Sequence, residues 1–165
     1  MNKLERFYKG KKVLVTGHTG FKGSWLSIWL LELGARVIGY SSDIPTNPYS
    51  NFEACRLKAR VKHIVGDIRD MEKLRGVFNK YKPEAVFHLA AQPIVRRSYK
   101  EPRETFLTNI VGTVNVLECL RDFDFVKSAV IITSDKCYEN KESRSGYREE
   151  DEMGGDDPYS ASKGA

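Results

Sequence analysis

The sequence has few cysteines, no long apolar run and no excess of one charge sign. Its 165 residues include three cysteines, an odd number without CxxC spacing, which argues against a disulfide framework or a metal site. No apolar run approaches the roughly 20 residues of a membrane-spanning helix. The polar start also lacks a signal-peptide core. We therefore expect a cytoplasmic protein with no membrane partner.

Charge is mixed along the chain. Lys and Arg total 27 against 22 Asp and Glu, which gives a formal net charge of +5. The two signs are interspersed, whereas a nucleic-acid-binding face needs clustered positive charge. A solvated surface is the better interpretation, no nucleic-acid partner is expected, and attraction of an acidic small substrate stays open.

Strand and helix patterns alternate from end to end. Alternation of this kind predicts an α/β fold, a Rossmann-type doubly wound parallel sheet with helices on both faces. A long loop is expected over 135–158, and Trp25 and Trp29 are expected in the core. The predicted strands are 13–15, 36–40, 61–65, 85–89 and 126–133, and the predicted helices are 25–33, 52–58, 71–81 and 103–122.

A glycine-rich turn joins the first predicted strand to the first helix. Gly17, Gly20 and Gly23 permit a tight turn, a close backbone approach to a pyrophosphate, and close packing of helix on strand. Phosphates bind well there because the helix N-terminus offers free N–H groups. The pattern predicts a dinucleotide site, with a plain glycine turn as the alternative.

Residues at the ends of later strands indicate how the cofactor would bind. Ser41 occupies the position where an acidic residue usually meets the ribose, and Asp43 follows slightly late. No Arg follows to receive a 2′-phosphate, so NAD is favoured over NADP. Asp67 could accept a hydrogen bond from the adenine amino group, and Ile68 could pack on the adenine ring. Asp70 is interpreted as the N-cap of the next helix.

The fourth and fifth predicted strands end in small or polar residues. Leu89-Ala90-Ala91 allows a flat cofactor to cross the strand tip, whereas His88 is interpreted as a core histidine. After the long loop, Tyr159 and Lys163 stand four residues apart and share a helix face. A lysine ammonium beside a phenol favours the phenolate, which makes Tyr159 a candidate general base.

In this order the motifs resemble the extended short-chain dehydrogenase/reductase family, and within it the nucleotide-sugar 4,6-dehydratases. The resemblance covers essentially the whole chain and the first half of such an enzyme. We therefore expect residues 1–165 to be one NAD-binding Rossmann domain of a longer protein, with the C-terminal substrate domain absent. The segments that carry the resemblance are 16–25, 66–70, 88–99, 108–109, 134–140 and 154–163.

The resemblance implies an NAD-dependent lyase for a nucleotide sugar, with CDP-glucose favoured. Tyr159 would deprotonate the sugar 4-hydroxyl while hydride moves from C4 to NAD, water would leave across C5 and C6, and the hydride would return to C6. Ser134 would bind the 4-oxygen, and Asp135 would protonate the leaving hydroxyl. Lys136 stands where a glutamate base is often found, so its role as the C5 base is an open question.

The same resemblance implies a set of binding residues. Gln92, Arg96 and Ser134 would meet substrate, although Arg96 and Arg97 are equally well explained as solvated charges. Lys163 would bind the ribose and tune Tyr159. The cofactor would be lined by Gly17, Thr19, Gly20, Phe21, Lys22, Gly23, Ser41, Asp43, Asp67, Ile68, Leu89, Ala90, Ala91, Gln92, Thr108, Thr133, Tyr159 and Lys163.

Two other functions and one partner are also expected from these residues. A nucleotide-sugar epimerase, or a dehydratase of another nucleotide sugar, would use the same Tyr159 and Lys163, but an epimerase has no need of Asp135. A catalytically inactive NAD-binding fragment is the alternative from a different class. Similar enzymes form homodimers through the counterparts of helix 103–122 and the helix that begins at Tyr159.

Overall fold

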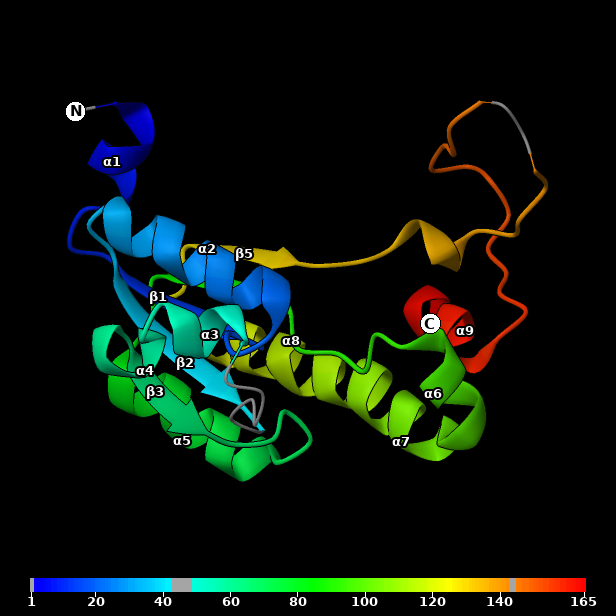
Figure 1. The fold of residues 1–165 in the computed structure, drawn as a ribbon, viewed down its shortest axis with the longest axis horizontal. Helices are drawn as coiled ribbons and strands as arrows, with labels where there is room; N and C mark the ends of the chain where they lie inside the picture. Colours follow the sequence, from blue (N-terminus) through cyan, green and yellow to red (C-terminus); the bar gives the residue numbers. More distant parts are fainter. Residues whose placement is uncertain (1, 43–48, 143–144) are drawn as a thin grey trace.

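Five parallel strands form one sheet in the order β3-β2-β1-β4-β5 (Figure 1). The structure, a computed structural model, describes residues 2–42, 49–142 and 145–165. The strand order reverses between β1 and β4, which confirms the predicted Rossmann-type doubly wound sheet. The strands are β1 (Lys12–Thr16), β2 (Arg36–Ser41), β3 (Lys62–Val65), β4 (Ala85–His88) and β5 (Ser128–Ile131).

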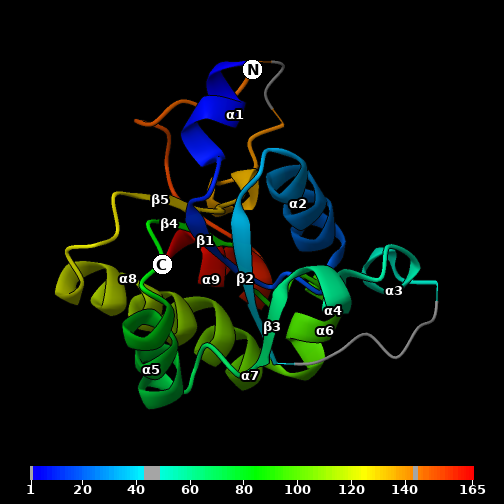
Figure 2. The ribbon, with the colours of Figure 1, turned by 90° about the vertical axis from the view of Figure 1, so that its left-hand side faces the viewer.

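Helices cover both faces of the sheet, because successive strand residues point to opposite sides. In β1, Leu14 belongs to one buried cluster, and Val13 and Val15 belong to the other. Figure 2 shows α2 on one side of the sheet and α5 and α8 on the other. On the α2 side are α2 (Phe21–Glu32), α3 (Asn51–Ala54) and α4 (Leu57–Arg60), and on the opposite side are α5 (Met71–Tyr81) and α8 (Gly112–Asp122).

The predicted helix 103–122 is a continuous helical segment with a change of winding in its middle. Pro102 occupies the first turn of α7 (Pro102–Phe106), where its missing N–H costs no hydrogen bond. A π-helical turn, η1 (Leu107–Val111), joins α7 to α8. Such turns are frequent at functional sites because they redirect side chains locally.

Two helices were not predicted. The first is α1 (Lys3–Tyr8), whose start carries a capping box in which the Asn2 side chain accepts from the Glu5 backbone and the Glu5 side chain accepts from that of Asn2. That Asn-x-x-Glu signal is visible in the sequence. The second is α6 (Val95–Lys100), whose N-cap residue Ile94 has no side chain that can cap the helix, so it leaves no such signal.

The expectation that Trp25 and Trp29 lie in the core is wrong. Their exposed fractions are 54% and 57%, while Gly23, Ser24 and Ser27 on α2 are buried. These small residues occupy the buried face because α2 packs closely against the glycine turn, where larger side chains would not fit. The Ser27 hydroxyl donates to the Gly23 carbonyl at 2.7 Å, so its polar group is satisfied inside.

The segment after β5 is largely irregular, as predicted for 135–158. It contains a short 3₁₀ turn, η2 (Asp135–Cys137), and an isolated antiparallel bridge between Tyr138 and Met153. It ends at α9 (Pro158–Gly164), where Asp157 caps the helix by accepting from the Ser160 backbone. Among the helices in the described parts of the chain, none combines the length and apolarity needed to span a bilayer.

Candidate active site

A cleft of about 680 Å³ lies at the carboxyl ends of the strands, beside the switch point between β1 and β4. Open parallel sheets bind their ligands at this edge. The lining includes all the predicted cofactor-binding residues that the structure describes, whereas Asp43 lies outside the described residues. Arg97, considered above with Arg96, also lines the cleft. Further lining residues, which the motifs did not single out as binding residues, are Ser42, Gly66, Arg69, Pro93, Ile94, Glu104 and Ile132.

The glycine turn forms one wall of the cleft, and its geometry excludes side chains. Gly17 has a φ of +72°, and a Cβ there would lie 2.8 Å from the Ala90 nitrogen. A Cβ on Gly23 would lie 2.1 Å from the Gly17 carbonyl oxygen. Gly20 occupies the N-cap of α2, where no side chain caps the helix. The first turn therefore presents its backbone to the cleft, an arrangement that favours an anion.

The end of β2 is tied to this turn by a pair of hydroxyls. The Thr19 and Ser41 side-chain oxygens lie 2.7 Å apart, and both residues are buried. Ser41 thus occupies the position where an acidic residue usually binds the ribose, and its hydroxyl forms a hydrogen bond with that of Thr19.

Asp67 lies at the end of β3 with its carboxylate in an ion pair with Arg69. The hydrogen bonds from Arg69 hold the pKa of Asp67 below its usual range. Ile68 is buried against Gly112 of α8 while also lining the cleft. Asp70 caps α5 by accepting from the Lys73 backbone at 3.0 Å, as the N-cap interpretation required.

His88, at the end of β4, is a satisfied core histidine. Its Nδ1 lies 2.7 Å from the Thr16 hydroxyl and its Nε2 lies 3.0 Å from the Thr113 hydroxyl. Burial, and secondarily the charge of Lys163, lowers its pKa to about 4. His88 therefore supports the strand tips and belongs to the core.

Gln92 is buried and its side-chain amide is used inside the protein. Its Nε2 donates to the Thr105 hydroxyl at 2.9 Å, and its Oε1 accepts from the Ile94 backbone at 2.7 Å. The Asn109 side chain accepts from the Gln92 backbone at 2.8 Å and donates to the Ser162 hydroxyl at 2.8 Å. Asn109 therefore connects the end of β4 to α9.

The predicted catalytic residues divide into two groups. Ser134, Tyr159 and Lys163 line the cleft, and the Lys163 ammonium donates to the Ile132 carbonyl at 2.9 Å. Burial lowers the pKa of Lys163. Asp135 and Lys136 lie in η2, adjacent in sequence to Ser134 but not among the cleft-lining residues.

The two arginines considered for binding, Arg96 and Arg97, differ in their position relative to the cleft. Arg97 lines the cleft and pairs with Glu101 at 2.8 Å, one helical turn along α6. Arg96 is exposed and is not a cleft-lining residue. The side of α6 that faces the cleft therefore carries Arg97 rather than the predicted Arg96.

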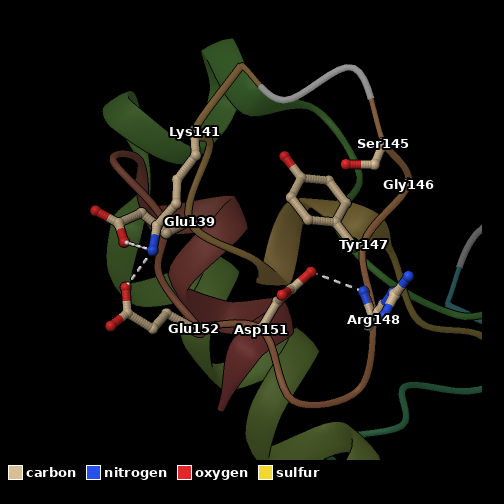
Figure 3. A pocket seen from close by; sticks show the side chains of 8 residues that line it. All are labelled: Glu139, Lys141, Ser145, Gly146, Tyr147, Arg148, Asp151 and Glu152. Atoms are coloured by element: carbon tan, nitrogen blue, oxygen red, sulfur yellow. Dashed lines mark hydrogen bonds and ion pairs between the residues drawn. The ribbon is translucent and has the colours of Figure 1, made fainter.

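A smaller cavity of about 230 Å³ lies within the loop that precedes α9 (Figure 3). Lys141 reaches Glu152 at 2.6 Å and Glu139 at 3.6 Å. The Tyr147 ring stacks on Tyr138 with centroids 4.9 Å apart. These contacts give the loop local structure outside the cleft.

The fold and the glycine-lined cleft define a Rossmann-type domain of the short-chain dehydrogenase/reductase class. The family model described as GDP-mannose 4,6 dehydratase matches residues 14–165. The chain belongs to this family of extended short-chain dehydrogenases/reductases.

Individual proteins of known name are similar over nearly the whole chain. A CDP-glucose 4,6-dehydratase from Salmonella typhimurium is 58% identical over 97% of this chain and 44% of its own length. An epimerase structure from Methanothermobacter thermautotrophicus is 32% identical, with a TM-score of 0.80, over 97% of this chain and 46% of the other. A UDP-glucose 4-epimerase from Brucella ovis, solved in complex with NAD, is 26% identical, with a TM-score of 0.77, over 93% and 45%. The chain spans less than half the length of each of these proteins.

Proposed function

We propose that this chain is the NAD-binding part of a nucleotide-sugar 4,6-dehydratase whose substrate is CDP-glucose. The observation that carries the proposal is the 58% identity to a CDP-glucose 4,6-dehydratase, together with Ser134-Asp135 directly after β5. Ser134 shares the cleft with Tyr159 and Lys163, the residues proposed for redox chemistry at the sugar.

The cleft fits NAD by shape and by charge. Gly17 and Gly23 leave no room for side chains beneath the turn, so backbone can approach a pyrophosphate. The start of α2 favours the pyrophosphate charge, and the Asp67 carboxylate is an acceptor at the other end of the cleft. Ser41 and Lys163 would hold the two ribose groups. NAD in the Brucella ovis epimerase supports the same choice.

The chain's own residues would handle the protons of the reaction. NAD, when bound, supplies reversible hydride acceptance at the sugar. Tyr159 would take the proton of the 4-hydroxyl, and Ser134 would hold the same oxygen by a hydrogen bond. Lys163, held by the Ile132 carbonyl, would favour the phenolate of Tyr159 by its positive charge.

The dehydration step would use the residues after Ser134. Asp135 would protonate the hydroxyl that leaves C6, and Lys136 in its neutral form is the candidate to take the C5 proton. The Ser134 hydroxyl contacts both residues, since it donates to an Asp135 carboxylate oxygen at 3.3 Å and accepts from the Lys136 backbone at 3.2 Å. We therefore expect η2 to carry the step that separates a dehydratase from an epimerase.

A homodimer is the proposed assembly of the whole protein. Apolar side chains are exposed on the helix that runs from α7 to α8, namely Phe106, Val111, Val114 and Leu117. A second copy would cover this face, as similar enzymes pair through this helix and the counterpart of α9.

Mass spectrometry of nucleotide sugars incubated with the chain and NAD tests the function. The panel contains CDP-glucose, dTDP-glucose, GDP-mannose and UDP-glucose. Loss of one water from CDP-glucose alone supports the proposal. A product of unchanged mass that chromatography separates from its substrate as an epimer supports the epimerase, the second candidate favoured by the structural neighbours. A chain that binds NAD and leaves every sugar unchanged supports an NAD-binding role without catalysis.

Two aspartate variants sharpen the result. Asp135→Asn should lower dehydration about a hundredfold, because a general acid contributes on that scale. An epimerase reaction should be unaffected by the same change. Asp124→Asn, in the exposed turn before β5, removes the same charge at a distance and should leave either activity unchanged.

A further inference from the structure

The Arg69 side chain forms hydrogen bonds with both carboxylate oxygens of Asp67. Its Nε lies 3.0 Å from Oδ1 and 3.0 Å from Oδ2, and its Nη2 donates to Oδ2 at 2.6 Å. The Arg69 backbone N–H also donates to Oδ1 at 2.8 Å. Arg69 was not among the predicted binding residues, yet it lines the same cleft as Asp67.

This pairing limits what Asp67 can offer a ligand. An ionised carboxylate has about four acceptor positions, two on each oxygen. Oδ1 already receives two N–H groups, from the backbone and from Nε, while Oδ2 receives the terminal nitrogen and shares Nε. Oδ2 therefore retains the capacity to accept one more hydrogen bond. The Asp67 carboxyl is ionised near neutral pH and Arg69 lowers its pKa further, so that contact can only be an acceptor contact.

Arg69 is itself held by a residue of α7. Its Nη1 pairs with Glu104 of α7, a second cleft-lining carboxylate. The Asn115 side chain of α8 donates to the carbonyls of Ile68 and Arg69 at 2.9 and 3.2 Å. The Tyr40 hydroxyl donates to the Asp67 carbonyl at 2.8 Å. The position of the Asp67 carboxylate is thus fixed from three elements.

We propose that Arg69, braced by Glu104, is a positioning residue that makes Asp67 an obligate acceptor for the 6-amino group of the cofactor's adenine. The inference rests on the proposed NAD site and adds to it a source of base specificity. A 6-amino purine donates to such an acceptor, whereas a 6-oxo purine presents a second acceptor and is repelled.

Nicotinamide hypoxanthine dinucleotide provides the test, because it replaces the 6-amino group of NAD with an oxygen. Calorimetry would measure the dissociation constants of NAD and of this analogue for the unaltered chain and three variants. The unaltered chain should prefer NAD by about tenfold or more, the usual effect of a hydrogen bond to a charged group. In Arg69→Gln the preference should fall toward one, chiefly through weaker NAD binding. In Glu104→Gln it should fall partway.

The matched control is Arg75→Gln, which removes a similar ion pair between α5 and Asp122 of α8, away from the cleft. It should keep the full preference for NAD. Equal weakening of both dinucleotides in Arg69→Gln, or an unchanged preference in a folded Arg69→Gln or Glu104→Gln, overturns the role of Arg69. Failure of the unaltered chain to bind NAD overturns the proposed function instead, so the two failures are distinguishable.

Discussion

Gly23 and Gly76 are both helical glycines, and an added methyl group meets different surroundings at each. At Gly23 it would lie 2.1 Å from a backbone oxygen, which no side-chain rotation can relieve. Gly23→Ala should therefore push α2 away from the turn and destabilise the fold by about 1–3 kcal/mol. Because the turn is part of the proposed NAD site, the same change should weaken NAD binding by about tenfold or more. Urea unfolding and calorimetry measure the two effects.

Gly76 of α5 is the matched control for that variant. No atom lies within 4 Å of a Cβ built there, and the residue is exposed. Gly76→Ala should stabilise the protein by about 1 kcal/mol, because alanine is the better helix former. NAD binding should not change. A Gly23→Ala protein as stable as Gly76→Ala would contradict the close packing of α2 on the turn.

At the scale of the element, α2 shows that an apolar side chain need not be a buried one. Leu30 is 1% exposed, whereas Trp29 beside it is more than half exposed. Leu30→Ala should cost about 2–5 kcal/mol of unfolding free energy, as buried leucines do. Trp29→Gln should cost less than about 1 kcal/mol, since surface changes are usually small. Denaturant titration of both variants checks the difference, and equal costs would mean that Trp29 is buried in solution.

The sequence predicts the elements better than their faces. All five strands follow from apolar runs, and β1, β2 and β4 are buried on both sides, where a strand needs no alternation to be recognised. The buried face of α2 could not be predicted from apolar spacing, since Gly23, Ser24 and Ser27 approach the turn too closely for larger side chains. The short helix α6 lacked a capping residue, and so left no local signal.

Some residues of the cleft could likewise be predicted from local patterns, and others could not. The glycine turn, Asp67 and Tyr159 were predictable because each stands at the end of an element with a recognisable pattern. Glu104 was not, because it meets Arg69 only when α7 lies across the end of β3, 35 residues away in sequence. The choice of Arg97 over Arg96 likewise depends on how α6 is rotated.

For the whole molecule, buried histidines should make stability depend on pH. Burial, then the neighbouring His63, lowers the pKa of His18 to about 4, and burial lowers that of His88 to about 4. Between about pH 6.5 and pH 4 the unfolded chain binds protons that the folded chain refuses, so stability falls as pH falls through this window. Each histidine contributes on the order of 3 kcal/mol to the loss.

Urea unfolding at several pH values tests this dependence. His88→Gln should flatten the slope between pH 6.5 and 4, even though losing its contacts to Thr16 and Thr113 lowers the stability at neutral pH. Replacing the exposed Lys100 by Gln is the control and should leave the slope as it is. A slope unchanged in His88→Gln would show that His88 has the same pKa in the folded and the unfolded protein, and would contradict the lowered value.

The π-helical turn at Leu107–Val111 has a consequence for how this gene can vary. A turn of this kind holds one residue more than the α-helical turn it replaces. Loss of a single codon here would leave an ordinary α-helical turn over nearly the same angle, so α7 and α8 would keep their faces. The side chains of the turn itself would be redirected, and Asn109 would lose its contacts to Gln92 and Ser162. A one-codon deletion at this turn should therefore break the connection between the end of β4 and α9 and leave Val116 of α8 facing the sheet.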